Sequence, residues 1–254
     1  MDVVLIGAGN VAHVLGRSLK AAGHVIIGIW NRDASKAEML AKELGAECYN
    51  NLSAIPENAD LYVLAVSDHA IADLAKQLNL KNGILIHNGG TVALEVLEGA
   101  APKYGVLWPM KMMRTSMKTL DDCTMVLDGS DEATREQLKE LACSLSKRVT
   151  IADNLTRRKM HLVAAMVSNF TNHLYHLASD YCTANSIDFS IFYPIIESVA
   201  RQIQTEYPGN IQAGPAFRGD ADTIEKHRQL LTDEQSLLKL YDAITASIRE
   251  KFPR

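Results

Sequence analysis

The sequence predicts an α/β fold, a doubly wound parallel sheet followed by an all-helical domain, and three observations support this prediction. Strand-like apolar runs and helix-like segments alternate over residues 1–152, as in a parallel sheet with crossover helices. A glycine pattern directly follows the first apolar run. Beyond residue 153 almost no strand pattern remains, and long stretches have helical composition. We therefore expect a sheet domain at residues 1–152 and a helical domain at residues 153–254.

The individual elements follow from apolar runs and helical periodicity. Strands are expected at 3–6, 25–30, 60–66, 83–87, 104–108, 124–127 and 148–152. Helices are expected directly after the first glycines and at 34–44, 70–78, 132–145, 154–183, 190–205, 221–231 and 234–251. Gly45 is the expected C-cap of the helix at 34–44, and Asp220 is a candidate N-cap in a glycine-punctuated loop.

Composition and charge limit the class of protein. The chain has 254 residues, of which 47% are hydrophobic and 22% are charged, and its net charge is −4, as in ordinary soluble globular proteins. This balance disfavours nucleic acid or an anionic membrane as the main partner. The chain enters a strand directly after Asp2, and its four cysteines lack metal-type spacing. We expect a cytoplasmic protein without a secretory signal, a membrane span or a metal site.

The pattern Gly7-x-Gly9-x-x-Ala12 marks the turn from the first strand into the first helix. The first glycine of such a pattern permits the tight turn, the second lets phosphates approach the backbone, and the alanine allows close helix–strand packing. The helix N-terminus adds partial positive charge. The alternative is a purely structural glycine turn. We predict a Rossmann-type dinucleotide site whose contacts here are Gly7, Ala8, Gly9, Asn10 and Val11.

Asn31 and Arg32 follow the second strand, where NAD-binding proteins place an acid that bonds the adenosine ribose. An uncharged Asn followed by a guanidinium suits a 2′-phosphate instead, because arginine can bind phosphate through two hydrogen bonds. Ser35 and Lys36 add a hydroxyl and a second cation. We predict NADP as the cofactor. Two alternatives stay open: Asp33 could be the ribose acid, and both cations could be ordinary solvated charges.

Further cofactor contacts are expected at the carboxyl ends of the strands at 60–66 and 83–87, where open parallel sheets bind ligands. Small residues there would let the nicotinamide half lie flat, and the polar side chains could bond its ribose or carboxamide. The glycine pair Gly89-Gly90 can equally be an ordinary tight turn, and His69 and His87 are expected to be structural. The expected contacts are Ala65, Val66, Ser67, Asn88 and Gly89.

The predicted helix at 154–183 carries the candidate catalytic residues. At 100° per residue, one narrow arc holds a stripe of His, Ser and Asn residues rather than the Lys and Glu of a solvated face. Such a stripe is common where a helix lines a polar cavity; the alternative is a hydrogen-bonded seam between helices, within the domain or across a dimer. We expect His161 to be the acid and base, with Ser168 and Asn169 orienting a substrate.

These motifs, together with Gly214-Pro215-x-x-Arg218-Gly219-Asp220, resemble a bacterial family of Rossmann-like proteins with a helical C-terminal domain of unknown function. The N-terminal half also resembles pyrroline-5-carboxylate reductase and deazaflavin-dependent NADP reductase, which share the Asn-Arg pair. The C-terminal half is similar to that of 6-phosphogluconate dehydrogenase. The resemblance implies NADP binding, a helical dimerisation domain and a cleft between the two domains.

Two departures from the related proteins bear on catalysis. Many relatives have a His-Pro-Leu segment where this chain has Trp108-Pro109-Met110. The interdomain helix of β-hydroxyacid-type dehydrogenases carries a catalytic lysine with an asparagine one turn further on, and the helix at 154–183 has His161 and Asn169 but no such lysine. Lys111 is a further candidate cation, and Arg218 could hold a substrate carboxylate or tie its loop to Asp220.

The sequence therefore predicts an NADP-dependent oxidoreductase that transfers hydride between NADP(H) and a small carbonyl or imine in an interdomain cleft. The alternative is a sensor or scaffold that binds NADP(H) without turnover, which the two departures favour. A third hypothesis is a structural dimer with a degenerate cofactor site. We also expect a homodimer through the helical domain, because its long helix carries a wide apolar arc.

Overall fold

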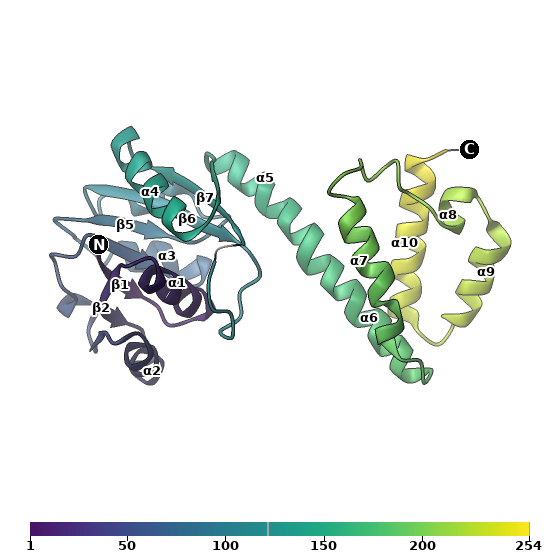
Figure 1. Cartoon of the computed structure of the whole chain (residues 1–254), viewed down its shortest axis with the longest axis horizontal. Helices are drawn as coiled ribbons and strands as arrows, with labels where there is room; N and C mark the ends of the chain where they lie inside the picture. Colours follow the sequence, from purple (N-terminus) through teal and green to yellow (C-terminus); the bar gives the residue numbers. More distant parts are fainter. Residues whose placement is uncertain (121, 254) are drawn as a thin grey trace. The chain divides into compact units, whose positions relative to one another are not determined.

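The computed structural model describes residues 1–120 and 122–253. The chain divides into two compact units, Met1–Phe170 and Thr171–Arg254. The first unit holds a sheet with helices on both faces, and the second is helical (Figure 1). No helix in the described ranges combines the length and apolar character needed to cross a membrane. The predicted fold class, a Rossmann-type α/β sheet followed by a helical region, is confirmed.

An eight-stranded sheet forms the frame of the first unit, in the order β3-β2-β1-β4-β5-β6-β7-β8. The first six strands, β1 through β6, all run parallel to one another. The last two strands run in the opposite direction: β7 is antiparallel to β6 and parallel to β8. Strand order changes direction between β1 and β4, which is the switch point where doubly wound sheets bind ligands. The strands are β1 (Asp2–Ile6), β2 (Val25–Trp30), β3 (Glu47–Tyr49), β4 (Leu61–Leu64), β5 (Ile84–His87), β6 (Lys103–Met110), β7 (Thr124–Gly129) and β8 (Arg148–Ile151).

Helices of the first unit connect these strands. They are α1 (Asn10–Ala21), α2 (Ala34–Leu44), η1 (Leu52–Ala54), α3 (Asp68–Ala75), η2 (Leu94–Leu97), α4 (Glu132–Leu145), α5 (Asn154–Ala164) and the π-helical segment η3 (Ala165–Phe170). The second unit contains α6 (Thr171–Ala184), η4 (Phe189–Phe192), α7 (Tyr193–Gln202), α8 (Pro215–Arg218), α9 (Ala221–Leu230) and α10 (Gln235–Lys251).

Two large hydrophobic cores cover the two faces of the sheet, and a third, smaller cluster packs β6 and β7 against α5. Val3 and Leu5 of β1 enter the core beneath α1, α2 and α4, whereas Val4 and Ile6 enter the core beneath α3, η1 and η2. All four side chains are fully buried. A parallel strand buried on both faces is apolar throughout rather than alternating, which is why the first strand reads as a continuous apolar run.

The predicted helix caps are confirmed. Gly45 ends α2 in the left-handed region, with φ of 69°, which glycine adopts without steric cost. Asp220 caps α9, where its Oδ1 accepts a hydrogen bond from the Thr223 amide at 3.0 Å. Gly45 and Asp220 therefore fix the end of one predicted helix and the start of another.

Four differences from the predicted elements have physical reasons. Strand β3 was not expected because it has three partly exposed residues and therefore little apolar signal. Strands β7 and β8 run antiparallel to the rest of the sheet, which was not predicted because an apolar run does not reveal the direction of its strand. The helix predicted at 154–183 is interrupted by η3, whose wider turn breaks the 100° spacing assumed for its polar stripe. The compact units meet between residues 170 and 171 rather than at 152, because α5 packs on the sheet unit through the buried Arg157.

The second unit is held together by contacts of its last helices. The His227 Nδ1 atom lies 2.9 Å from the Tyr241 hydroxyl, which joins α9 to α10. Arg228 pairs with Asp242 at 3.3 Å between the same helices. The ring of Phe217 meets that of Phe252 edge-on at 5.3 Å. These contacts stabilise α8, α9 and α10 as one packed group.

Candidate functional site

The turn between β1 and α1 requires glycine at its first position. Gly7 has φ of +120°, and a Cβ added there would lie 2.7 Å from the Ala65 carbonyl carbon. The Gly7 amide donates to the Trp30 carbonyl at 2.7 Å. Because both the dihedral angle and the close backbone approach exclude a side chain, Gly7 fixes the turn that ends β1 beside β2 and β4.

Gly9 serves a different purpose from Gly7. A Cβ added at Gly9 would meet no atom of the described chain within 4 Å, so packing does not demand glycine there. Gly9 is the N-cap of α1, and no side chain in the described residues caps that helix end. The first amides of a helix need acceptors, and an anion can supply them. The turn is therefore an open cradle for phosphate, as the glycine pattern predicts.

A cavity of about 1130 Å³ lies over this turn, at the carboxyl ends of the parallel strands. Most of its lining comes from three segments: the glycine turn, the end of β2 with the start of α2, and the end of β4 with α3. Of the cofactor contacts predicted from sequence, the following line it: Gly7, Ala8, Gly9, Asn10, Val11, Asn31, Arg32, Lys36, Ala65, Val66 and Ser67.

Ser35, Asn88 and Gly89 were also predicted as cofactor contacts but are not among the residues that line this cavity. Ser35 instead turns its hydroxyl to Asp33, at 2.7 Å. The Asn88 amide donates to the Leu107 carbonyl at 2.5 Å, while its buried Oδ1 has no hydrogen-bond partner in the described part of the chain. Gly89 is buried against α3, so a Cβ there would lie 3.1 Å from the Asp68 Oδ1 atom.

The end of β2 distributes its charges unequally. Asp33 caps α2 by accepting from the Ser35 amide at 3.1 Å, and the Ser35 hydroxyl and backbone bonds hold the pKa of its carboxyl below the usual range. Lys36 lies 3.7 Å from the same carboxylate. Arg32 makes no hydrogen bond or ion pair with any residue of the described ranges, and it lines the cavity. The carboxylate is thus occupied by the helix end, whereas a guanidinium faces the cavity unpaired.

The structure adds cavity residues that sequence reasoning missed. Four lie on one face of α3, and Gln77 continues that face just beyond the helix end, at a helical spacing that could have been recognised. The others come from α1, from the strand end at β2 and from the segment between β6 and β7. The added residues are His13, Trp30, His69, Ala70, Asp73, Leu74, Gln77 and Thr115. Asp33, the ribose acid of the alternative interpretation, also lines the cavity.

His161 on α5 belongs to the same unit as the cavity and packs against two segments of the sheet. Its ring lies 5.5 Å from the ring of Trp108, at an interplanar angle of 39°. A Cβ added at Gly90 would lie 2.6 Å from the His161 Cδ2 atom and 2.9 Å from Trp108. Gly90 therefore makes room for the Trp108–His161 pair, so the second glycine after β5 has a packing reason.

A short run of contacts leads from the cavity to His161. Ser67 lines the cavity, and its neighbour Asp68 accepts a hydrogen bond from the Thr91 hydroxyl at 2.8 Å. The backbone between Asn88 and Thr91 thus lies against the start of α3 on one side and against His161 on the other. The segment after β5 joins the two predicted parts of the site.

Ser168 and Asn169 lie on η3, and their hydrogen bonds are local. The Ser168 hydroxyl is 2.5 Å from the Ala164 carbonyl and 3.0 Å from the Asn169 Oδ1 atom. Neither residue lines the cavity over the glycine turn. π-Helical turns are rare and recur at functional sites, so η3 remains a place to test although its polar groups bond within the helix.

Arg157 fixes α5 to the segment after β5. The side chain is fully buried, and its Nη2 donates to the Val92 carbonyl at 2.5 Å and to the Asn154 Oδ1 atom at 2.8 Å. That same Asn154 oxygen accepts from the Leu94 amide at 2.9 Å. Because His161 lies one turn beyond Arg157, these bonds set its ring against Gly90.

His87 is the fully buried last residue of β5 and is structural, as expected. Its Nδ1 accepts from the Gly89 amide at 3.1 Å, and its Nε2 lies 3.3 Å from the Ala93 carbonyl. Burial, with the nearby Arg157 charge, lowers the pKa of His87 to about 4. Both ring nitrogens of the neutral form are satisfied, so protonation would cost the Gly89 bond.

The remaining candidates take structural places. Lys111 forms an ion pair with Asp122. Arg218 ends the short helix α8, and its charge contributes to lowering the pKa of Asp220 after the larger effect of the Thr223 hydrogen bonds. The Asp220 carboxylate itself bonds the start of α9 through Thr223.

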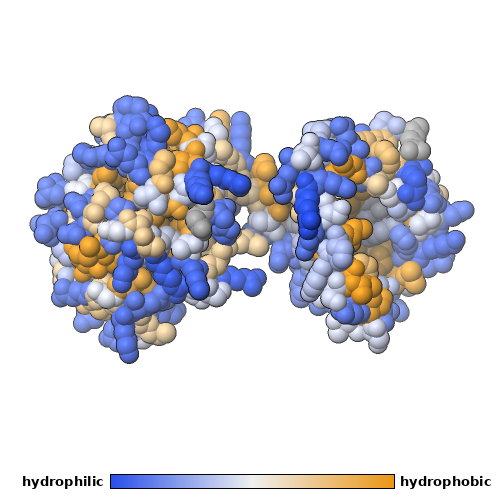
Figure 2. Space-filling model, viewed as in Figure 1, coloured by the Kyte–Doolittle hydropathy of each residue, from blue (hydrophilic) through white to orange (hydrophobic). Residues whose placement is uncertain are grey.

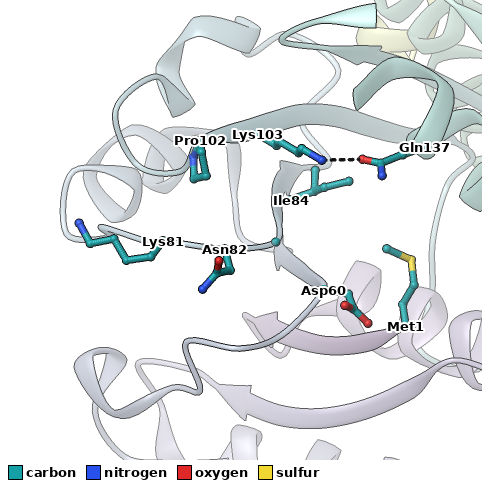
Figure 3. A pocket seen from close by; sticks show the side chains of 9 residues that line it. Met1, Asp60, Lys81, Asn82, Ile84, Pro102, Lys103 and Gln137 are labelled. Atoms are coloured by element: carbon teal, nitrogen blue, oxygen red, sulfur yellow. Dashed lines mark hydrogen bonds between the residues drawn. The ribbon is translucent and has the colours of Figure 1, made fainter. Parts of the chain in front are cut away.

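A second cavity of about 540 Å³ lies at the opposite edge of the sheet, near the amino ends of β5 and β6 (Figure 3). Two of its charged side chains bond within the protein: Lys103 donates to Gln137 at 3.3 Å, and Asp60 accepts from the Asp2 amide at 2.7 Å. Ligands of doubly wound sheets bind at the carboxyl ends of the strands, so the cavity over the glycine turn is the candidate site.

Comparisons with known proteins support this site. Residues 2–88 match the family described as NADP oxidoreductase, coenzyme F420-dependent, and residues 123–248 match a domain of unknown function, DUF2520. A Bacteroides fragilis protein assigned by inference as an NADP oxidoreductase is 32% identical over 98% of both chains, with a TM-score of 0.91. The family resemblance predicted from sequence is confirmed, and the N-terminal family is an NADP-dependent one, as the predicted cofactor requires.

More distant solved structures share the fold. Imine reductase from Myxococcus stipitatus, in complex with NADP+, is 16% identical, covering 98% of this chain and 93% of its own, with a TM-score of 0.71. Pyrroline-5-carboxylate reductase from Streptococcus pyogenes is 14% identical, covering 99% and 97%, with a TM-score of 0.68. The chain also matches glutamyl-tRNA reductase of Chloroherpeton thalassium, 27% identical over 157 residues that are 58% of this chain but only 34% of that protein. The chain thus spans about a third of the curated relative.

Proposed function

The chain belongs to the family that joins an NADP-oxidoreductase N-terminal domain to a DUF2520 C-terminal domain, and we propose that it is an NADP-dependent oxidoreductase acting on a small carbonyl or imine. The imine reductase and pyrroline-5-carboxylate reductase that share its fold support this substrate class. NADP(H) would supply or accept a hydride at the nicotinamide C4 atom.

One observation carries the proposal: two anion-binding features of the cavity have no partner in the described part of the chain. The N-terminus of α1 lacks a side-chain cap, and Arg32 lacks an ion pair. Uncapped helix amides suit a diphosphate, and a free guanidinium suits a 2′-phosphate. With Asp33 held by the end of α2, the carboxylate that would repel that phosphate is withdrawn.

In this proposal His161 gives a proton to the substrate heteroatom during reduction and takes it back during oxidation. Imidazole is the side chain most often used for such transfers. The Nε2 atom is suited to this role because it adjoins Cδ2, the ring atom nearest Gly90. Trp108 and the Arg157 bonds hold the ring in place. Ser168 and Asn169 would orient the substrate from η3.

The test compares coenzyme binding with turnover. NADPH affinity would be measured by calorimetry, and NADPH oxidation would be assayed with a panel of carbonyl and imine substrates. Both measurements would be made on wild type, His161→Ala and the exposed control His173→Ala. We expect wild type and control to oxidise NADPH equally, and His161→Ala to lose about a hundredfold or more in kcat without a change in NADPH affinity. Wild type that fails to bind NADPH would contradict the proposal.

A second candidate, a sensor that binds NADP(H) without turnover, is favoured by one observation. The Trp108 ring packs against the His161 ring in a tilted arrangement, and Trp108 is itself only 9% exposed. A histidine packed in this way can serve as a structural contact rather than an acid. Tight NADPH binding with no oxidation by any substrate of the panel would favour the sensor.

We also propose that the second unit forms a homodimer. Large apolar side chains lie at its surface (Figure 2), and a monomer rarely leaves so many together. The strongly exposed ones on and around α7 are Ile191, Tyr193, Ile195, Val199, Ile203 and Tyr207.

Light scattering would test the dimer through two matched variants. We expect Ile195→Asp to yield a monomer, because Ile195 is 62% exposed on α7. The control Met39→Asp changes an equally exposed side chain on α2, 69% accessible, and should leave the dimer intact. A wild-type monomer, or a dimer in both variants, would contradict this surface.

A further inference from the structure

We propose that the turn at residues 114–117, between β6 and β7, forms an outer wall of the coenzyme cavity and that the Thr115 hydroxyl binds the diphosphate bridge of NADP(H). The inference rests on the proposed function, because it places NADP(H) in the cavity over the glycine turn. It starts from one observation: Thr115 lines that cavity together with Gly9 and Asn10, although it comes from a segment outside the nucleotide-binding motifs.

The 114–117 segment is an ordered β-turn. The Met117 amide donates to the Arg114 carbonyl at 3.0 Å, and the Arg114 amide faces the Met117 sulfur at 3.4 Å. Thr115 and Ser116 are therefore the two central residues, and both are exposed. A turn presents its central side chains outward, which leaves the Thr115 hydroxyl available at the cavity wall.

Helix α1 holds this turn beside the glycine cradle. The Asn10 side-chain amide donates to the Met113 carbonyl at 3.1 Å. Two turns further along α1, the Arg17 guanidinium donates to the Met117 carbonyl at 2.7 Å and also to the Thr115 carbonyl. The helix whose first amides face the predicted diphosphate therefore also fixes the opposite wall.

Arg17 is itself held in place by α2. Its Nε donates to Glu43, and the other Glu43 oxygen lies 2.9 Å from the His13 Nδ1 atom. The Arg17 hydrogen bond, followed by that of His13, holds the pKa of Glu43 below its usual range. Glu43 is thus ionised at neutral pH and keeps Arg17 aligned with the turn.

The base of the segment is fixed as well. Lys111 pairs with Asp122 across its two ends, and Met113 and Met117 pack against the core beneath α1. The wall is therefore part of the packed unit rather than a free loop. This fixation lowers the ordering cost of a contact with ligand.

The chemistry of the wall matches a diphosphate. Phosphate oxygens accept hydrogen bonds from backbone amides and hydroxyls alike. The helix N-terminus supplies amides from one side, and Thr115 supplies a hydroxyl from the other. Arg32 and Lys36 lie at the end of β2, where the adenosine ribose is expected. The diphosphate bridge and the 2′-phosphate of the coenzyme thus meet different parts of the cavity.

Calorimetry with matched variants tests this assignment. We expect Thr115→Ala to weaken NADPH binding about ten- to a hundredfold, as loss of a hydrogen bond to a charged group predicts. Thr115→Ser keeps the hydroxyl and Ser116→Ala changes the neighbouring one, so both should bind like wild type. Adenosine 2′-monophosphate, which lacks the diphosphate, should bind every variant equally.

A second measurement needs no substitution. Arg114 and Lys118 are exposed, so trypsin can cut beside the turn, and saturating NADPH should protect these bonds whereas adenosine 2′-monophosphate should not. Unchanged NADPH affinity in Thr115→Ala would contradict the assignment of the Thr115 hydroxyl to the diphosphate. Tight NADPH binding by wild type would at the same time remain consistent with the proposed function. If wild type binds no NADPH, both proposals fail.

Discussion

The two ends of the site are built in different ways. The coenzyme end is made of consecutive residues: Gly7 and Gly9 shape the turn, and Arg32 follows the next strand. The His161 end brings together the segment after β5, Trp108 of β6 and α5, which lie far apart in the sequence. The proposed coenzyme contacts therefore follow from local sequence, whereas the position of the proposed proton donor depends on tertiary packing.

The comparison also separates two kinds of glycine. Glycine is required at position 7 because a Cβ would clash with the Ala65 backbone, and at position 90 because a Cβ would clash with the Trp108–His161 pair. Both glycines are therefore explained by packing within the protein. At Gly9, by contrast, a Cβ would contact no atom of the described chain within 4 Å. A glycine that the fold does not need, at an uncapped helix start, indicates a ligand.

The largest expected effect comes from Gly7→Ala. The substitution forces a Cβ at positive φ against the Ala65 backbone, and we expect it to lower the free energy of unfolding by about 3 kcal/mol or more. Gly9→Ala should keep the thermal midpoint of wild type and instead weaken NADPH binding about tenfold or more, because its methyl group occupies the phosphate cradle. Thermal denaturation and calorimetry on both variants distinguish the two roles. Equal stability losses in the two would contradict the distinction.

The next effect sharpens the description of the segment after β5. The pKa of buried His87 falls from 6.5 to about 4, so the unfolded state takes up a proton at a pH where the native state does not. This contribution is fully present above pH 6.5 and is lost as the pH falls towards 4, by about 3 kcal/mol for a shift of this size. Urea denaturation between pH 7 and 4 should show a shallower decline for His87→Gln. The exposed control His69→Gln should follow the wild-type slope.

The smallest of these effects concerns the position of His161. Arg157→Met removes the bonds from α5 to Val92 and Asn154, and we expect kcat to fall about ten- to a hundredfold through misplacement of the imidazole. The NADPH dissociation constant should stay within about twofold, because Arg157 does not line the cavity. Arg157→Lys, which can still donate to both oxygens, should recover part of kcat. A parallel loss of NADPH affinity and kcat would instead indicate a general structural role.

The predictions from sequence were most accurate where a feature depends on residues that are close together in the chain. The fold class, the glycine turn and the pair Asn31-Arg32 all follow from short-range patterns. They were least accurate where an element depends on its surroundings: β3 is too short to show an apolar signal, and η3 disturbs a helix that periodicity treats as regular. Thr115 and Arg157 could not be identified, because only the folded chain brings them to the cavity or beneath the segment after β5.

The most direct test of the central claim is coenzyme selectivity measured by calorimetry on wild type and Arg32→Ala, with Lys76→Ala, an exposed cation outside the cavity, as control. We expect wild type to prefer NADPH to NADH, and loss of Arg32 to weaken NADPH binding about ten- to a hundredfold while NADH binding stays unchanged. Equal affinity of wild type for the two coenzymes, or an Arg32→Ala variant that retains full NADPH affinity, would contradict this claim.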